Sequence, residues 1–591
     1  MKNSILSTVR AILDATNSSN ALFASTTAGN RKGNNSSKLS LAKMACIVTV
    51  FCAATAILSS AQTNFTNLLS FNGNNGADPH FVNLVQGTDG NLYGTTYTST
   101  GSGGTVFKVT VGGALTTLYT FCKGGEPCLD GAQPNAGLVL ASNGDFYGTT
   151  INGGVNTDGT VFEITSAGSL TTLHSFDMTD GALPQVALVQ ANNGNLYGTT
   201  STGGTDDVGT VFQITTGGTL TSLHSFDGTD GNAPNVSLVQ GTNGNLYGAT
   251  YEGGTGSGTV YEMTPAGTFS TLHTFDPAEG AGLTGALVQA SNGNFYGTDI
   301  GGGTGMGTIY EITPSGTLTT LHSFCSKPDC TDGAIPYAGL IQGTDGNLYG
   351  TTFAGGANTT SCNAGCGTVF QITTAGKFTT LYNFCSQANC ADGSAPQGGL
   401  VQATNGTFYG TTYYGGTDGL GTIYSLSVAL SPFVKTLPTS ANTGTTIIIM
   451  GNNLTGTTQV LFNGVAANFT VVSNTEIKAI VPAGATTGTV TVVTPSGTLK
   501  SNVVFVIVIA GPQIKSFTPK SGPVGTAVTI TGVGLTQTTT VTFDGVAATS
   551  FTVHSDKKVT ATVPTGAKTG KIAITTLTGT ATSTTSFTVT E

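Results

Sequence analysis

Seven near-copies of one short segment, spaced about 50 residues apart, limit the folds open to this 591-residue chain. The segment reads GNLYGTT at 90–96 and recurs around Tyr147, Tyr197, Tyr247, Tyr296, Tyr349 and Tyr409. A period near 50 residues is typical of the four-stranded blade of a β-propeller and is too long for one coil of a solenoid. The repeat therefore predicts a series of similar β units rather than one large core.

Residues 188–227 illustrate how one unit is expected to fold. Alternating apolar and polar residues predict strands at 188–190, 195–200, 210–215 and 220–226. The turns Asn192-Asn-Gly194 and Gly217-Gly218 are short, and a glycine-rich loop at 203–209 joins the second strand to the third. Each unit is therefore predicted to be a four-stranded meander.

The two ends of the repeat region complement each other. Residues 64–71 match a fourth strand that lacks its first three, whereas the last unit departs from the pattern at Ser431-Pro432 after three strands. We expect an all-β fold with a seven-bladed β-propeller over 62–428, closed by the N-terminal strand 64–71 so that no sheet edge stays open. The alternative is that residues 428–430 supply the last strand themselves.

The repeat resembles the GloVer-type tandem repeat of exported bacterial proteins. The shared pattern is NGNLYGTT, then GG, then GTVF-x-IT, and then LTTLHSF, and seven units carry it across about 62–428. The resemblance implies propeller-like repeats and an exported protein. It implies no catalytic residue and no activity.

The period changes after Pro432, where two copies of a different and longer pattern follow. Residues 462–467 (FNGVAA) match 543–548 (FDGVAA), and alternating runs such as Ala527–Thr531 predict strands. These copies resemble IPT/TIG domains, an immunoglobulin-like family. The resemblance implies two β-sandwiches, at 431–510 and 511–591.

The N-terminal region and the cysteines both indicate export. Basic residues precede an apolar run at 44–58 and small residues follow it, so 1–61 is predicted to be a signal peptide region, with an uncleaved anchor as the alternative. Eight cysteines remain and fall in close pairs, which predicts the disulfides Cys122-Cys128, Cys325-Cys330, Cys362-Cys366 and Cys385-Cys390. Zinc is the rival, but the spacings are irregular and no histidine lies within the pairs, so we expect neither metal nor cofactor. We expect a secreted or cell-surface protein without a stable membrane span after cleavage. The net charge of −10 disfavours a nucleic-acid partner.

The loops that vary in length should share one face of the propeller, and this face is where we place candidate binding residues. Loops between units carry an acidic residue before glycine in six cases, at Asp130, Asp180, Asp230, Glu279, Asp332 and Asp392. These acids serve either as turn residues or as an acidic rim for a cationic ligand. Aromatic residues end four second strands near the same face, at Tyr97, Tyr251, Phe353 and Tyr413, where they either stack on a ligand or pack at strand ends.

Four fourth-strand histidines, His174, His224, His273 and His322, alternate with tyrosine in other units and are interpreted as packing residues rather than metal ligands. The acids repeat symmetrically, and apart from the cysteines we identify no break in the symmetry that would mark a catalytic centre. The leading hypothesis is a non-catalytic binding or adhesion protein for a glycan or protein ligand. The alternatives are a carbohydrate-active hydrolase or lyase using acids such as Asp206 or Asp332, and a structural component of the cell surface.

Overall fold

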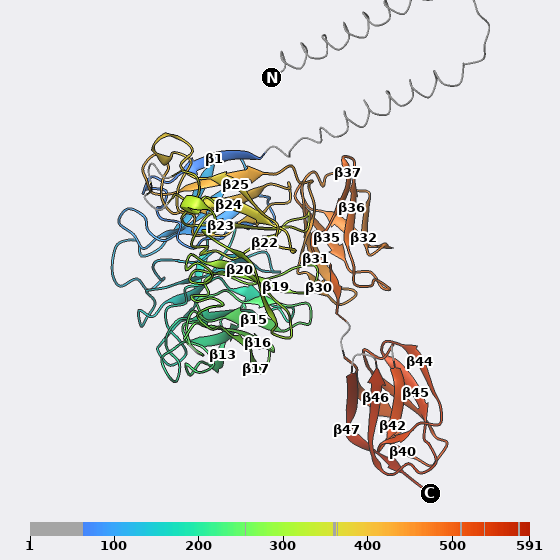
Figure 1. Ribbon diagram of the computed structural model, residues 1–591. Coiled ribbons are helices and arrows are strands. Elements are labelled where there is room, and N and C mark those ends of the chain that lie inside the picture. The colour runs from blue at the N-terminus through green and yellow to red at the C-terminus, as the bar shows by residue number, and fades with distance from the viewer. Residues whose placement is uncertain are drawn as a thin grey trace, which may run out of the picture. The chain divides into compact units, whose positions relative to one another are not determined.

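The computed structural model describes residues 63–591 except 255, 359–361, 363–364, 509–510, 537 and 577–578. The predicted signal peptide region, 1–61, lies outside the described residues. The described chain is all-β, with two short 3-10 helices, η1 (Pro328–Cys330) and η2 (Ala388–Cys390) (Figure 1). Within this described part, no helix has the length and apolar character needed to cross a bilayer.

Residues 64–427 form seven four-stranded antiparallel sheets, each a meander of four strands in chain order except the last. The first strands are β2 (Val85–Gln86), β6 (Val139–Leu140), β10 (Val189–Gln190), β14 (Val239–Gln240), β18 (Val288–Gln289), β22 (Ile341–Gln342) and β26 (Val401–Gln402). The second strands are β3 (Leu92–Thr96), β7 (Phe146–Thr150), β11 (Leu196–Thr200), β15 (Leu246–Ala249), β19 (Phe295–Asp299), β23 (Leu348–Thr352) and β27 (Phe408–Thr412).

The third strands are β4 (Thr105–Val109), β8 (Thr160–Ile164), β12 (Thr210–Ile214), β16 (Thr259–Met263), β20 (Thr308–Ile312), β24 (Thr368–Ile372) and β28 (Thr422–Ser427). The fourth strands are β5 (Leu115–Thr120), β9 (Leu170–Ser175), β13 (Leu220–Ser225), β17 (Phe269–Thr274), β21 (Leu318–Ser323), β25 (Phe378–Asn383) and, in the seventh sheet, β1 (Asn64–Ser70). Strand positions predicted for residues 188–227 agree with β10 to β13 to within one residue at each end.

Packing explains why the segment NGNLYGTT recurs. In the third sheet, the ring of Phe212 on β12 lies over Gly198 on β11, and a Cβ at Gly198 would come within 2.6 Å of that ring. Gly194 turns the chain with a φ of +86°, which favours glycine. The Asn193 amide then donates to the Tyr197 hydroxyl at 2.7 Å and fixes the turn against the strand. The motif therefore encodes one turn and one close approach of a ring to the backbone in each unit.

Successive sheets bury their faces against one another. Eight side chains of the second and third sheets form one cluster: Ala141, Tyr147, Val161, Phe176, Leu188, Leu196, Phe212 and Ile214. The corresponding positions of the seventh and first sheets form another: Ala403, Tyr409, Ile423, Phe71, Leu84, Leu92, Phe107 and Val109. The seventh sheet thus packs on the first as the second packs on the third, although the seventh and first sheets come from opposite ends of the repeat region.

Strand β1 occupies the fourth position of the seventh sheet. It pairs antiparallel with β28 from Asn64↔Ser427 to Ser70↔Thr422, with a register shift at the place where the other fourth strands have one. The alternative segment, 428–430, is not part of a strand.

Equivalent hydrogen bonds join successive sheets, and one of them joins the seventh sheet to the first. The Gln240 side-chain oxygen accepts from the Asn192 N–H at 2.9 Å, and Gln86 accepts from the Thr404 N–H, also at 2.9 Å. The second of these bonds joins the seventh sheet to the first, as the first joins the third to the fourth.

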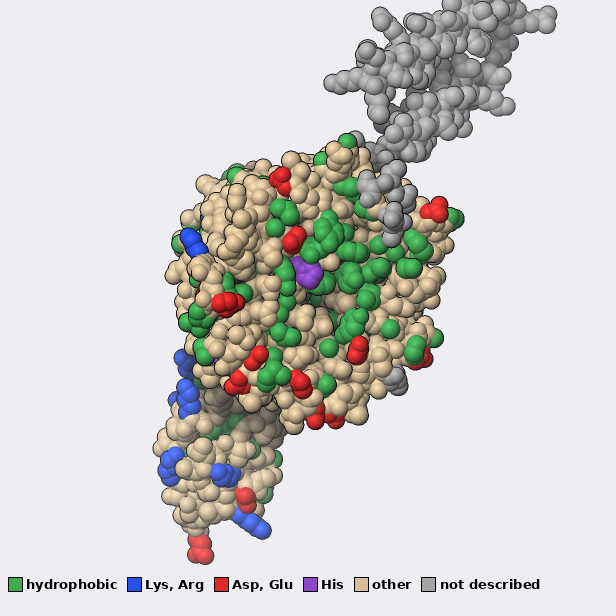
Figure 2. All heavy atoms as spheres, turned by 90° about the vertical axis from the view of Figure 1, so that its left-hand side faces the viewer, with side chains coloured by type: hydrophobic (Ala, Val, Ile, Leu, Met, Phe, Trp, Pro, Cys, Tyr) green, Lys and Arg blue, Asp and Glu red, His purple; other side chains and the backbone are tan. Residues whose placement is uncertain are grey.

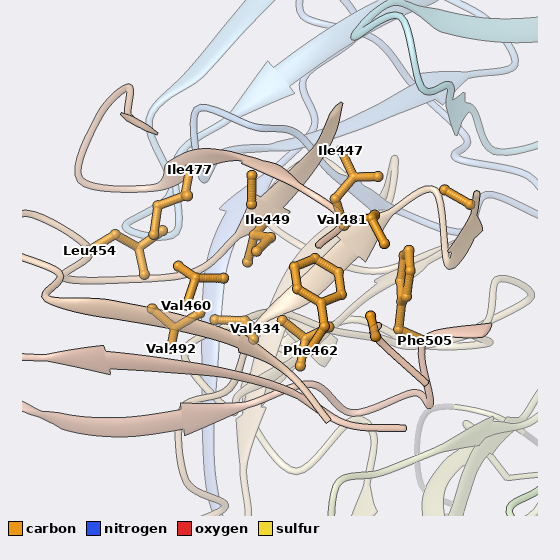
Figure 3. Packing of buried hydrophobic residues seen from close by; sticks show 14 residues of the cluster. Val434, Ile447, Ile449, Leu454, Val460, Phe462, Ile477, Val481, Val492 and Phe505 are labelled. Atoms are coloured by element: carbon orange, nitrogen blue, oxygen red, sulfur yellow. The ribbon is translucent and has the colours of Figure 1, made fainter. Parts of the chain in front are cut away.

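The C-terminal region contains two further cores. In 431–508, one sheet has the order β29 (Lys435–Leu437), β31 (Thr446–Met450), β35 (Glu476–Ile480) and β34 (Phe469–Val471), and a second has β33 (Val465–Ala466), β32 (Gln459–Phe462), β36 (Val490–Thr494) and β37 (Gly497–Lys500). Strand β30 (Ser440–Ala441) pairs in parallel with β38 (Val506–Ile507). Side chains of both sheets interleave, and Phe462 meets Phe505 edge to face at 5.1 Å (Figure 3).

Residues 511–591 repeat this arrangement. One sheet runs β39 (Gln513–Thr518), β41 (Ala527–Val533), β45 (Lys558–Thr562) and β44 (Phe551–Ser555). The other runs β40 (Ser521–Gly522), β47 (Gly579–Val589), β46 (Gly570–Thr576), β42 (Thr538–Phe543) and β43 (Val546–Ala547). A buried cluster with Phe517, Val541 and Phe587 fills the space between these sheets.

Residues of the first C-terminal core, 431–508, are hydrogen-bonded to short turns of the repeat region. The Asn452 amide donates to the Thr404 hydroxyl at 2.7 Å, and the Thr475 hydroxyl donates to the Thr88 carbonyl at 2.8 Å. Both turns join a first strand to a second strand. The longer, variable loops lie at the other ends of these strands.

Candidate functional site

A cavity of about 220 Å³ is lined by residues from all seven units. Six of its lining residues occupy one position of the repeat, directly after the proline that ends each loop between units, or after Leu283 in the fifth sheet. These residues are Asn135, Gln185, Asn235, Thr284, Tyr337 and Gln397. In the first unit, which has one extra residue here, Phe81 lines the cavity. The fold thus brings together side chains from equivalent positions of successive repeats.

Several polar atoms at this cavity have no partner among the described residues. The side-chain oxygens of Asn235, Thr284 and Gln397 are inaccessible to solvent and make no hydrogen bond. Gln397 is only 8% exposed. Buried polar groups without partners cost free energy, and most such groups in native proteins are satisfied. Three of the residues that line this cavity therefore carry a polar atom that no described protein group satisfies.

The other carboxamides are already engaged. The Gln185 amide donates to the Ser201 hydroxyl at 2.9 Å, and the Asn135 amide donates to the Gln185 carbonyl at 3.4 Å. The Asn135 side-chain oxygen is hydrogen-bonded to the His80 ring, and Asn135 is 1% exposed. The second and third sheets therefore supply a fixed wall, and the unpartnered groups come from the fourth, fifth and seventh.

Aromatic rings surround the cavity. His80 lies 5.4 Å from Tyr97 and 5.2 Å from Tyr413, measured between ring centroids. Tyr337 meets Phe81 edge to face at 5.8 Å and Phe353 at 5.2 Å. Figure 2 shows hydrophobic side chains gathered around a histidine on one face, with most acidic side chains nearer the margin of that face.

The four aromatic residues selected from the sequence lie at or near this site. Tyr251 lines the cavity itself. Tyr97 and Tyr413 flank His80, and Phe353 packs on Tyr337, which lines the cavity. Burial lowers the pKa of His80, against the opposing effects of its hydrogen bond to Asn135 and the charge of Asp78. The imidazole is therefore neutral near pH 7, and it adds no charge beside the cavity.

The six loop acids occupy a different place. Asp180 and Asp230 each lie 2.8 Å from the fourth-strand histidines His174 and His224, and Asp130 accepts from the Tyr119 hydroxyl at 2.9 Å. Glu279, Asp332 and Asp392 make the corresponding contacts with His273, His322 and Tyr382. Most of these acids also accept backbone N–H groups of their own loop, as Asp180 does from Asp177. None of the six is among the described residues that line the cavity.

The acid–histidine pairs therefore explain both residue patterns. In five loops a fourth-strand histidine or tyrosine is hydrogen-bonded to the acid, in the sixth His322 lies 3.3 Å from Asp332, and the acid holds the turn that leads to the next sheet. Burial lowers the pKa of His322, which is opposed by the charge of Asp332.

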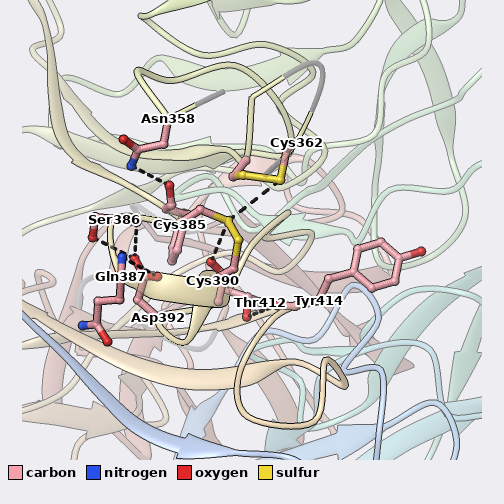
Figure 4. The surroundings of a disulfide bond; sticks show 12 residues. Asn358, Cys362, Cys385, Ser386, Gln387, Cys390, Asp392, Thr412 and Tyr414 are labelled. Atoms are coloured by element: carbon pink, nitrogen blue, oxygen red, sulfur yellow. Dashed lines mark hydrogen bonds between the residues drawn. A yellow bond between two sulfur atoms is a disulfide. The ribbon is translucent and has the colours of Figure 1, made fainter. Parts of the chain in front are cut away.

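The cysteines form the four predicted disulfides, Cys122–Cys128, Cys325–Cys330, Cys362–Cys366 and Cys385–Cys390. The last two lie side by side, with Sγ of Cys362 3.8 Å from Sγ of Cys385 (Figure 4). All four sulfur atoms lie within 4.8 Å of one another. Since each sulfur is bonded to another, this cluster offers no thiolate to a metal ion.

The sequence interpretation missed the residues that line the cavity. A sequence signal for these residues was present. The equivalent position, which follows a proline or Leu283, varies among Asn, Gln, Thr and Tyr, whereas the proline before it and the Leu-Val-Gln after it hardly change. The repeat symmetry also breaks at a position that was not selected from the sequence. Asp299 stands where six other units have threonine, and it is fully buried.

Comparisons with solved structures give low TM-scores. A surface glycan-binding protein, SGBP-B, from a xyloglucan utilization locus in Bacteroides uniformis is 26% identical over 26% of this chain and 48% of its own, with a TM-score of 0.15. One from Prevotella bryantii is 22% identical over 27% of this chain and 39% of its own, with a TM-score of 0.20. A fungal alcohol oxidase of the AA5 family, in complex with copper, is 13% identical over 75% and 99% of the two chains, with a TM-score of 0.43.

The chain thus spans about half the length, or less, of the first two structures. At these TM-scores the likenesses carry no functional argument. No curated protein sequence matches the chain.

Family models match the first repeat pattern and the second of the two C-terminal copies. A model of the Gloeobacter/Verrucomicrobia repeat matches at 53–257, 186–362 and 253–472, and a model of the IPT/TIG domain matches at 512–590. The repeat matches together cover most of the chain and all seven sheets. The chain therefore belongs to the Gloeobacter/Verrucomicrobia repeat family, with a C-terminal IPT/TIG domain.

Proposed function

We propose that the seven sheets are the blades of one closed propeller that serves as a non-catalytic, extracytoplasmic glycan-binding head. Residues 431–510 and 511–591 would then be two immunoglobulin-like modules that carry it. The equivalent clusters and glutamine bonds between the seventh and first sheets support closure. Four disulfides support an oxidising compartment outside the cytoplasm.

The observation that carries the binding proposal is the cavity's set of side chains. Asn235, Thr284 and Gln397 offer unpartnered polar atoms, and Tyr251 and Tyr337 offer ring faces and edges. Hydroxyl groups of a sugar donate to carboxamide oxygens, and the C–H face of a sugar ring packs on an aromatic ring. Together these groups suit a polyhydroxylated ligand better than an apolar one.

The same lining argues for binding rather than turnover. Glycoside hydrolysis requires two carboxyl groups on either side of the scissile bond. No carboxylate, imidazole or thiol is found among the described residues that line the cavity. Asp206 is exposed on a loop, and Asp332 is buried against His322, so the two acids named for the enzyme alternative do not converge at the cavity.

A glycan array followed by titration calorimetry on the purified protein tests the proposal. Asn235→Ala and Gln397→Ala should each weaken binding about fivefold, since one hydrogen bond contributes about 1 kcal/mol. Because the oxygen atoms removed make no internal hydrogen bond, both variants should fold as the wild type does.

Asn442→Ala, which removes an exposed carboxamide from the first C-terminal core, is the matched control and should bind normally. Unchanged affinity in both cavity variants would refute the assigned site. Release of new reducing ends from a bound glycan would refute the non-catalytic assignment.

A further inference from the structure

We infer that the cavity binds the terminal residue of an uncharged glycan, with the rest of the chain extending into solvent. This inference rests on the proposed function and specifies the ligand of the same site. Three features carry it: the described lining of the cavity shares no residue with that of the neighbouring cavity, the cavity is small, and its lining is uncharged.

Glycines that directly follow lining residues of the cavity pack against the backbone of the neighbouring unit. A Cβ on Gly137 would lie 2.2 Å from the Asn83 carbonyl oxygen, and one on Gly398 would lie 2.1 Å from that of Val82. These contacts join the first unit to the second and the seventh unit to the first. The backbones of successive units approach so closely here that a side chain does not fit between them.

A second cavity lies beyond these residues, at the ends of the first strands β6, β10, β14 and β18. Among the described residues, none lines both cavities. We therefore infer that the candidate site and the second cavity are separate, so that a glycan chain enters and leaves the site through one mouth. A ligand enters such a site by an end.

The volume sets how much of the ligand enters. Sites for drug-sized molecules typically measure about 300–1,000 Å³. A cavity of about 220 Å³ is smaller than that range. One sugar ring, and not a stretch of several, matches a space of this size.

Charge sets the chemical class of the ligand. The cavity lining holds amides, hydroxyls, aromatic rings and small apolar groups, with no cation to pair with an acidic sugar. Residues 63–430 contain 24 acidic residues and 4 lysines. The surrounding negative potential opposes the approach of a uronic acid or a sulfated sugar. Neutral sugars pay no such electrostatic cost.

The unpartnered groups also orient the sugar. Asn235 and Thr284 line the cavity from the adjacent fourth and fifth units, and Gln397 lines it from the seventh. Tyr251 and Tyr337 line the cavity from the fourth and sixth units. Since these oxygens are shielded from solvent, a terminal ring that donates hydroxyls to them requires the three side chains to turn toward the cavity.

The test is a calorimetric titration of the purified protein with gluco-, xylo- and manno-oligosaccharides of increasing length, from the monosaccharide to the hexasaccharide. It also includes a cyclic glucan, which has no chain end, and oligogalacturonate, which is anionic. We expect the affinity for the preferred series to stop rising by the disaccharide. The cyclic glucan should not bind, and the anionic series should bind at least tenfold more weakly.

Affinity that climbs through the hexasaccharide, or equal binding of the cyclic glucan, would overturn terminal recognition while leaving a glycan-binding cavity in place. Equal or tighter binding of oligogalacturonate would overturn the uncharged class. Binding that survives both Asn235→Ala and Gln397→Ala, or no binding by any oligosaccharide, would overturn the proposed function and this inference with it. Asn442→Ala again serves as the control.

Discussion

Replacing Asp299 with threonine should abolish one pH-dependent component of stability. Asp299 ends β19 and is fully buried, and it accepts hydrogen bonds from the Gly302 N–H at 2.5 Å and from the Thr308 hydroxyl. Other units place a threonine here, as where Thr200 bonds Thr210 at 2.9 Å. Burial raises the pKa of Asp299 to about 6, although the hydrogen bonds from Thr308 and Gly302 act in the opposite direction.

The direction in which the free energy of unfolding changes with pH follows from proton binding. The ordinary pKa of 3.8 applies in the unfolded chain, so between pH 3.8 and about 6 the folded protein binds the extra proton. This stabilising contribution is complete below pH 3.8 and is lost as the pH rises through 6. A difference of about two pKa units corresponds to about 3 kcal/mol, at 1.36 kcal/mol per unit, and about 2 kcal/mol of it falls between pH 4 and pH 7.5.

Urea unfolding at pH 4, 5, 6 and 7.5 would measure the effect, followed by tyrosine fluorescence because the chain has no tryptophan. All other carboxyl groups titrate in both proteins and cancel in the difference between Asp299→Thr and wild type. We expect the free energy of unfolding of the variant to gain about 2 kcal/mol relative to wild type from pH 4 to pH 7.5. Asp299→Asn, which keeps the side-chain shape without titrating, should show the same gain. A difference that stays flat with pH in both variants would refute the reasoning.

Three further outcomes test the fold. Deleting residues 63–70 should lower the melting temperature and cause self-association through the freed edge of β28, and the missing strand added as a peptide should reverse both; an unchanged monomer in size-exclusion chromatography would contradict closure. Gly198→Ala should cost about 1–3 kcal/mol in urea unfolding, because the new methyl group meets Phe212; a neutral effect would contradict the close approach. Cys366→Ser leaves a Cys362 thiol 3.8 Å from Cys385, so peptide mass mapping at pH 8 should find a new Cys362–Cys385 bond and a free Cys390, whereas an intact Cys385–Cys390 bond alone would contradict the proximity.

The local structure of the repeat was predictable from sequence because its causes are local. Alternation along 210–215 places Val211 and its neighbours in a strand, and glycine at 194 turns the chain, whatever the distant surroundings are. The fourth-strand match at 64–71 also pointed to the position that β1 occupies beside β28. The disulfides followed from close cysteine spacing and an exported context.

The contacts between the loop acids and the fourth-strand histidines could not be predicted from the sequence. Asp180 and His174 recur at fixed spacing, but spacing alone did not reveal that each acid bonds the strand before it. Sequence therefore left a turn residue and a ligand contact as open alternatives. The side-chain geometry places the acids in the turns.

The cavity was decided by tertiary structure alone. Asn235, Thr284 and Gln397 are separated by roughly one to three repeat lengths, and nothing in any one repeat makes such a position special. Only the packing of the sheets on one another brings them within one small volume and removes their access to water. The sequence by itself determined the strands, the turns and the repeat, because these depend on residues a few positions apart. The structure decided which side chains meet, because that depends on how seven distant segments pack together.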